Sequence, residues 1–333
     1  MLYNDYNEGI YILHENPEWI PPFTQAFNRA GVGFGEIVLT KGAMDIDSIP
    51  PQGVFWSRLS ASSHTRGNVY SKEYGRAILT WLESHGRRVI NGSSVLELEV
   101  SKVRQYLALS KAGFRTPKTI AVFGKEDLLE CAKRLPTPFI TKHNQGGKGL
   151  GVRRFESLEE FRAYIESSEF ELPIDGITLL QEYIESKEFF ITRLEFIGGK
   201  FHYAVRVDTS NGAFELCPAD ACDIERSKAL PEIAGGACDI GRADKFSLRT
   251  DIDSDTPLVR ALEQFLQAHR IEVAGVEFIE SVSGEIVVYD INTNTNYNSV
   301  VESSLREQGR QAAADRIVEF LSAQLETIQR SKQ

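Results

Sequence analysis

Short apolar runs alternate with helical patterns over residues 1–92. The apolar runs predict strands at 9–13, 36–39, 53–57 and 87–91, and the periodic segments predict helices at 23–31 and 71–86. Such alternation is typical of a parallel sheet with crossover helices. The following Asn-Gly-Ser-Ser, residues 91–94, is expected to mark a module boundary.

A further series of helices and strands is predicted from residue 101 on. A helix is predicted to begin at Ser101 and to end at Gly113. Further strands are predicted after Thr116-Pro117, over 138–142 and over 177–184, with helices at 125–135 and 158–167. Residues 189–208 alternate around Gly198-Gly199, which predicts a hairpin.

Residues 209–253 show no clear period and contain proline, glycine and three cysteines. A stretch of this length inside a compact domain is usually functional or mobile. We expect it to be mobile without ligands and to close over the substrates. For the rest of the chain, the sequence predicts a helix at 257–269, a second hairpin at 275–298 and a helix at 312–328.

Composition restricts the function classes. The 333 residues are 42% hydrophobic and 25% charged, which suits two or three modules. The net charge is −10 with no sustained basic stripe, which argues against a nucleic-acid partner. No apolar run reaches the roughly 18 residues of a membrane span, and the start has no basic segment typical of a secretory signal. With four cysteines, the sequence predicts a soluble, cytoplasmic protein acting on small molecules or peptides.

A glycine-rich loop follows an apolar strand that ends at Lys142. The loop contains Gly146, Gly147, Lys148 and Gly149 and leads into another predicted strand. Glycines let backbone N–H groups approach an anion, and lysines neutralise a polyphosphate. The loop is therefore either a flap over a nucleotide or a flexible hairpin with an exposed lysine.

The second hairpin carries polar groups where a buried strand is expected. Its turn at Ser283-Gly284 brings Glu277 close to the level of Asp290, and Asn292 shares a strand face with Asp290. Oxygen ligands in such a cluster suit Mg²⁺. The alternative is an edge strand with solvated polar ends.

In order along the chain, four motifs resemble the ATP-grasp superfamily, and within it the RimK-like and glutathione-synthetase-like carboxylate–amine ligases. The resemblance extends from about Val54 to Leu321. Its motifs are the Asn-Gly and Lys102 segment, the strand lysine with its glycine flap, the hinge "LLQEYI" and the acid pair of "GVEFI…VVYDINTN". Ser101 stands where the family has Asp, and the two acids of the metal motif are exchanged.

The resemblance implies an α/β ATP-grasp fold with a Rossmann-like module before it. The implied division is an N-terminal module at 1–92, a central subdomain with the flap at 93–181 and a C-terminal subdomain with the metal site at 182–333. It implies ATP with Mg²⁺ or Mn²⁺, and metal ligation by Glu277, Asp290 and Asn292. Its implied nucleotide-binding residues are Lys102, Lys142, Gly146, Gly147, Lys148, Gly149, Glu182, Tyr183, Ile184 and Glu188.

Arg193 and Arg206 are the catalytic residues that the resemblance implies, Arg206 lying near the acyl phosphate. Ile191 stands where RimK-like ligases have Asp, so Glu188 is expected to hold the ribose. The alternative for Glu188 is a solvated turn residue. Arg58 and Arg66 follow a strand of the N-terminal module and could pair with a substrate carboxylate, or be ordinary loop charges. A zinc site at Cys217, Cys222 and Cys238 is disfavoured, because the spacing matches no strong signature.

The predicted function is ATP-dependent amide formation through an acyl phosphate, with a small carboxylate and an amine, amino acid or peptide, as substrates. No nucleic-acid or membrane partner is expected, and a homo-oligomer is left open. One alternative is a ligase that matures a ribosomally made peptide precursor. The other is a non-catalytic ATP-binding protein.

Overall fold

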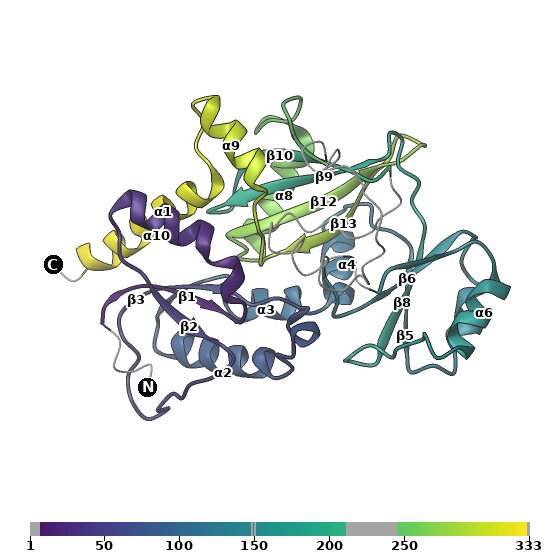
Figure 1. Ribbon diagram of the computed structural model, residues 1–333, viewed down its shortest axis with the longest axis horizontal. Helices are drawn as coiled ribbons and strands as arrows, with labels where there is room; N and C mark the ends of the chain where they lie inside the picture. Colours follow the sequence, from purple (N-terminus) through teal and green to yellow (C-terminus); the bar gives the residue numbers. More distant parts are fainter. Residues whose placement is uncertain (1–6, 148, 150, 211–244, 332–333) are drawn as a thin grey trace, which may run out of the picture.

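The computed structural model describes residues 7–147, 149, 151–210 and 245–331. Within these ranges the strands form three sheets, which lie in three different parts of the molecule (Figure 1). Two of the sheets, from the middle and the end of the chain, are antiparallel, and the N-terminal one is parallel.

The N-terminal sheet has the order β2-β1-β3-β4. Its strands are β1 (Gly9–His14), β2 (Gly35–Val38), β3 (Gly53–Arg58) and β4 (Arg88–Ile90). Side chains alternate between the two faces. Ile10 and Ile12 face α1 (Pro21–Ala30) and α10 (Ala313–Arg330), while Tyr11 and Leu13 face α2 (Ser71–Ser84).

The middle of the chain forms a small unit with the strand order β5-β8-β6-β7. Its elements are β5 (Thr119–Phe123), α5 (Leu128–Ala132), β6 (Phe139–His143), β7 (Arg153–Phe155), α6 (Leu158–Glu166) and β8 (Ile177–Glu182). A cluster of aromatic rings, Phe139, Phe155 and Phe161, joins the sheet to α6. This unit therefore has a core of its own, and the flap begins at the end of its strand β6.

The C-terminal sheet has the order β11-β10-β9-β12-β13. Its strands are β9 (Phe190–Ile197), β10 (Lys200–Asp208), β11 (Phe246–Arg249), β12 (Val273–Glu280) and β13 (Ile286–Asn292). One face packs against α4 (Lys102–Lys111), α8 (Pro257–Ala268) and α3 (Ser93–Glu99). The other face joins the N-terminal sheet and α10 in one hydrophobic core, and α9 (Ser299–Glu307) packs there as well. The last helix therefore lies beside α1, which comes from the opposite end of the chain (Figure 1).

The sequence predicted most of these elements, with differences of a few residues at their ends. Helices α3 and α9 were missed: residues 93–94 begin α3, where a boundary was expected. Part of 209–253 is ordered, because 246–249 forms a strand beside β10. Residues 211–244, with Cys217, Cys222 and Cys238, lie outside the described residues, as does the closure expected of them. The domain boundaries at 92/93 and 181/182 stay predictions.

Candidate active site

A cavity of about 510 Å³ opens between the central unit and the C-terminal sheet, and residues of the N-terminal module border it. Most of the residues chosen from the sequence line this cavity: Lys102, Lys142, Gly146, Gly147, Gly149, Glu182, Tyr183, Ile184, Arg193, Glu277, Asp290 and Asn292. Lys148 lies outside the described residues. Side chains from three regions of the chain therefore meet at one place.

The two carboxylates of the second hairpin lie opposite each other. Glu277 pairs with Asp290 in the antiparallel register of β12 and β13, and a bulge follows directly. The bulge also brings Tyr289 to this face, where its hydroxyl donates to Glu277 Oε2 at 2.8 Å. Asn292 Nδ2 lies 3.3 Å from Glu277 Oε1. Strand alternation and the tight turn thus place the three side chains together, as the sequence predicted.

Each carboxylate has a buried cation as its partner. Lys102 Nζ donates to Asp290 Oδ1, and Arg193 Nη1 donates to Glu277 Oε1 at 2.7 Å. Burial alone would raise the pKa of Asp290, but Lys102 and then Lys142 outweigh it and lower that pKa. Burial would likewise lower the pKa of Lys102, and the Asp290 carboxylate raises it instead. Both groups are therefore charged at neutral pH.

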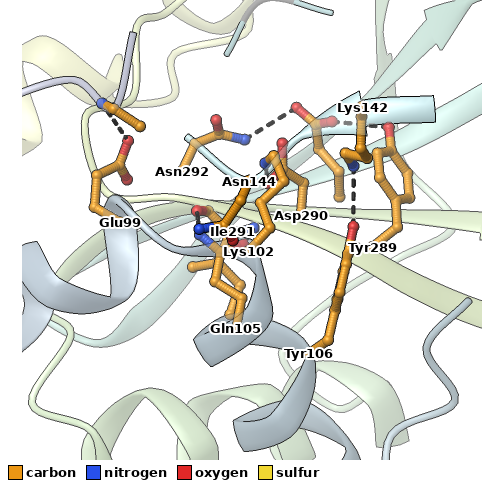
Figure 2. A network of polar contacts seen from close by, with 12 residues as sticks. Glu99, Lys102, Gln105, Tyr106, Lys142, Asn144, Tyr289, Asp290, Ile291 and Asn292 are labelled. Carbon is orange, nitrogen blue, oxygen red and sulfur yellow. Dashed lines mark hydrogen bonds and ion pairs between the residues drawn. The ribbon is translucent and has the colours of Figure 1, made fainter. Parts of the chain in front are cut away.

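Helix α4 holds Lys102 in its first turn against β13. Ser101 Oγ accepts from Arg104 N and caps the helix, and Asn144 Oδ1 accepts from Val103 N at 3.0 Å. Gln105, one turn further, bonds to both the N–H and the C=O of Ile291 on the free edge of β13. These contacts fix the helix so that Lys102 points at the carboxylate of β13 (Figure 2).

Lys142 lies at the end of β6 between two tyrosines. Its Nζ donates to the Tyr106 hydroxyl at 2.9 Å and lies 5.7 Å from the ring centroids of Tyr106 and Tyr289. The lysine is buried, so its ammonium has lost most of its water. A buried ammonium with one neutral hydrogen-bond partner is a strong site for an anion.

The guanidinium of Arg193, on β9, donates hydrogen bonds to three side chains. It donates to Glu195 Oε1 at 2.6 Å, to Thr295 Oγ1 at 2.5 Å and to Glu277. Gly275 makes room for it, because a Cβ there would lie 2.3 Å from Nη2. Arg193 therefore orients the carboxylates beneath the cavity.

Arg206 and Glu188 do not reach this cavity. Register pairs Val205 with Arg193, so Arg206 on β10 points to the opposite face of the sheet. There it lies over the Phe190 ring at 4.2 Å and lines a separate cavity of about 410 Å³ together with Glu188. The structure thus corrects the expected place of Arg206 beside an acyl phosphate and of Glu188 beside a ribose.

Arginines of the N-terminal module are bound within the protein. Arg58 is buried, and its Nη2 donates to Thr295 O at 2.7 Å and to Asn296 Oδ1 at 2.8 Å. Burial lowers the pKa of Arg58 to about 10. Arg66 Nη2 donates to the buried Glu15 Oε1 at 2.6 Å. Both side chains hold loops in place, which contradicts their use as a pair for a substrate carboxylate.

Sequence reasoning missed several residues of the site: Glu99, Gln105, Tyr106, Asn144 and Tyr289. Glu99 is buried, and its Oε2 accepts from Thr293 N at 2.7 Å and from Thr293 Oγ1 at 2.9 Å. Burial raises the pKa of Glu99. Gln105 and Tyr106 lie three and four residues after Lys102, so helical spacing alone could have placed them near it.

Known proteins resemble parts of this chain in sequence. No family model matches the chain. It is 34% identical over 118 residues to "Alpha-aminoadipate--LysW ligase LysX" of Sulfurisphaera tokodaii, and the match covers 34% of this chain and 41% of the relative. It is 26% identical over 207 residues to "Probable alpha-L-glutamate ligase" of Xanthomonas oryzae pv. oryzae, covering 57% and 68%. The chain thus spans less than half the length of the first relative.

Structural similarity extends over nearly the whole chain. The ATP-grasp ligase PsnB, complexed with a minimal precursor, superposes with a TM-score of 0.61 at 14% identity, covering 96% of this chain and 100% of PsnB. The chain has the ATP-grasp fold. Its resemblance to ATP-grasp ligases, expected from four motifs, is confirmed.

The ATP-grasp cavity offers two carboxylates and an amide that fit a hard divalent cation. Glu277 and Asp290 face each other across two strands, and Asn292 adds an amide oxygen. No cluster of three His, Cys, Asp or Glu side chains suited to a metal occurs in the described part of the chain. Over the same ranges, none of the helices is long and apolar enough to cross a membrane.

Proposed function

We propose that this protein is an ATP-dependent ligase that joins a carboxylate to an amine as an amide. An acyl phosphate would be the intermediate, and ADP and phosphate the other products. One observation carries the proposal: lysines from α4 and β6 and carboxylates from β12 and β13 line the same cavity as the glycine flap. Phosphoryl transfer needs such positioned charges and no nucleophilic side chain.

ATP would lie between the flap and the segment after β8. Gly146, Gly147 and Gly149 line the cavity on the flap side, and Tyr183 and Ile184 line it beside β8. Lys142, buried at the end of β6, would neutralise the phosphates. The adenine ring would form hydrogen bonds with the backbone of the segment after β8, as the hinge motif implies.

Glu277, Asp290 and Asn292 would hold Mg²⁺ or Mn²⁺. When bound, the ion neutralises charge on the phosphate oxygens. Arg193 and Lys102 hold the two carboxylates in place, through their bonds to Glu277 and Asp290. The donor set therefore suits the ion, and the chain itself supplies the counter-charge.

The chemistry would proceed in two steps. An oxygen of the substrate carboxylate attacks the γ-phosphorus, the bond to the β-phosphate oxygen breaks and ADP leaves. The amine then attacks the acyl carbon, and phosphate leaves. Lys102 and Lys142 would stabilise the negative charge on the transferred group, which makes electrostatic positioning the main contribution of the protein.

The first substrate is proposed to be an amino acid or a similar small acid. The names of the two sequence relatives, an α-aminoadipate–LysW ligase and a probable α-L-glutamate ligase, support an amino acid as one of the two substrates. We place the reaction in the cytoplasm, where ATP is made available and thiols stay reduced.

An ADP-release screen of amino acids tests the proposal, with hydroxylamine present as a general nucleophile and mass spectrometry of the products. Lys142→Met should abolish most ADP release and weaken ATP binding in calorimetry. Lys133→Met is the matched control, because that lysine is exposed at the C-cap of α5 and its ammonium bonds only to Glu130 in the described structure. Wild-type rates and ATP affinity in Lys142→Met would overturn the proposal for this site.

A peptide acceptor is the second candidate, since the structurally similar PsnB is described in complex with its precursor. Products from a ribosomal precursor but from no free amine would favour it. A non-catalytic ATP-binding protein would bind ATP and release no ADP with any acid of the screen.

A further inference from the structure

Glu99 is a buried carboxylate of the cavity wall that the proposed mechanism leaves without a role. Its Oε2 is held by Thr293. Its Oε1 has one weak contact, with Ala61 N at 3.4 Å. Among the described residues no lysine, arginine or histidine forms an ion pair with Glu99, and Lys102 Nζ is bound to Asp290. Lys102 is close enough to act electrostatically on Glu99 but forms its ion pair with Asp290, so Glu99 Oε1 is left with a single long hydrogen bond.

A second unused acceptor lines the same cavity. Asn294 Oδ1 is buried and has no hydrogen-bond partner in the described part of the chain. Asn294 follows Thr293, the residue that binds Glu99 directly. Unpaired buried acceptors are costly unless a ligand supplies donors. Glu99 Oε1, with one long hydrogen bond, and the unpaired Asn294 Oδ1 lie in one wall and fit a ligand group that carries several N–H donors and a positive charge.

The position of Glu99 relative to the phosphate lysine is also informative. In Figure 2, Lys142 lies on one side of Asp290 and Asn292, and Glu99 lies on the other side. A phosphate held at Lys142 and a cation held at Glu99 would thus approach the metal-binding residues from opposite directions.

We propose that Glu99 and Asn294 form the subsite for the ammonium group of the acceptor amine. The assignment rests on the proposed ligase function. The amine would bind as an ammonium ion whose N–H groups donate to Glu99 Oε1 and Asn294 Oδ1. This subsite selects a primary amine over a neutral nucleophile or a hydroxyl group.

Glu99 also provides a destination for the proton that the amine must lose. The ammonium gives one proton to Glu99 Oε1, which leaves the nitrogen lone pair free to attack the acyl carbon. The C–N bond forms, the C–O bond to the phosphate breaks, and the leaving phosphate takes the second proton. Glu99 then returns its proton to solvent, so atoms and charges balance.

The test compares Glu99→Gln with Thr293→Val. The Gln variant removes the negative charge but keeps an oxygen for Thr293, whereas the Val variant removes the hydroxyl bond at 2.9 Å and keeps the charge. Two nucleophiles serve as probes with the acid found by ADP release: glycinamide, a cationic amine, and hydroxylamine, which is neutral at neutral pH. Because a hydrogen bond to a charged group is lost, Glu99→Gln should raise the KM for glycinamide about tenfold to a hundredfold. Its hydroxamate formation should change little, and Thr293→Val should change neither.

Saturation-transfer NMR of glycinamide, with a non-hydrolysable ATP analogue present, separates this proposal from the ligase proposal. If no acid supports ADP release, the ligase function fails, yet glycinamide signals lost in Glu99→Gln and kept in Thr293→Val would still support the subsite. Failure of the unaltered protein to bind glycinamide would overturn the subsite. Equal effects of the two substitutions on binding and KM would also overturn it, because Glu99 would then only hold Thr293.

Discussion

Gly275 should tolerate no side chain, because Arg193 occupies the space where a Cβ would stand. An added Cβ would lie 2.3 Å from Nη2 and 2.6 Å from both Cζ and Nε of this buried guanidinium. Gly275 lies in the extended strand β12, so the cost comes from packing and not from the backbone. Gly275→Ala therefore tests how firmly Arg193 is held.

The expected loss in the free energy of unfolding follows from the contacts that Arg193 would lose. Overpacking a core usually costs about 1–3 kcal/mol. Moving the guanidinium also weakens its bonds to Glu195, Glu277 and Thr295, which are 2.5–2.7 Å long. Breaking a buried charge pair costs about 3–5 kcal/mol in general. Because the two effects overlap, we expect Gly275→Ala to lower the free energy of unfolding by about 3–5 kcal/mol.

Urea unfolding followed by tryptophan fluorescence measures this loss, with Gly33→Ala as the control. Gly33 is exposed and a Cβ there meets no atom within 4 Å, so its substitution should change stability by less than about 0.5 kcal/mol. In an Arg193→Met background, Gly275→Ala should cost far less, because the clash is gone. An equal cost in both backgrounds would show that the guanidinium is not the reason for the glycine.

Three further predictions concern other parts of the molecule. Asp290→Ala with Asn292→Ala should abolish ADP release while circular dichroism stays unchanged; unchanged turnover at ordinary Mg²⁺ would exclude these residues as ligands. Asn91→Ala should lower the free energy of unfolding by about 2–4 kcal/mol, since its amide bonds to Val273 N and O and to Thr293 O; a loss under about 1 kcal/mol would refute that role. His202→Gln should reduce the acid sensitivity of folding. Burial and then Arg316 lower the pKa of His202 to about 4, so the native histidine stays neutral while the unfolded one gains a proton as pH falls below about 6.5. The resulting loss of stability, up to about 3 kcal/mol between pH 6.5 and pH 4, should disappear in the variant and persist in a His269→Gln control.

Local sequence patterns were sufficient to place the three proposed metal ligands close together. The turn at Ser283-Gly284 fixes which residues of β12 and β13 face each other, and strand alternation fixes their side. The pairing of Glu277 with Asp290 could therefore be predicted from sequence alone. The bulge that brings Tyr289 to the same face could not, because the extra residue follows from packing around the hairpin.

The side of the sheet on which Arg206 lies could not be predicted from the sequence. The distance of Arg206 from Arg193 along the chain does not say which residue of β10 lies opposite Arg193 on β9. The observed register puts Val205 there and turns Arg206 to the other face. A shift of one residue in register reverses every side chain of a strand, so a resemblance in motif order cannot replace the pairing itself. Contacts between distant segments, such as Gln105 with Ile291, were equally beyond reach.

The charged side chains of the cavity wall differ from one end of the cavity to the other. Glu277 and Glu195 share the guanidinium of Arg193, and Asp290 pairs with Lys102. Lys142 lies outside these pairs with a single tyrosine hydroxyl, and Glu99 lies outside them with no ion-pair partner among the described residues. Lys142 and Glu99 lie on opposite sides of Asp290 and Asn292 (Figure 2). In a wall with little water, each attracts an opposite charge strongly. Under the proposed function, a polyphosphate would bind at Lys142 and an ammonium ion at Glu99, which would orient the two substrates before any bond forms.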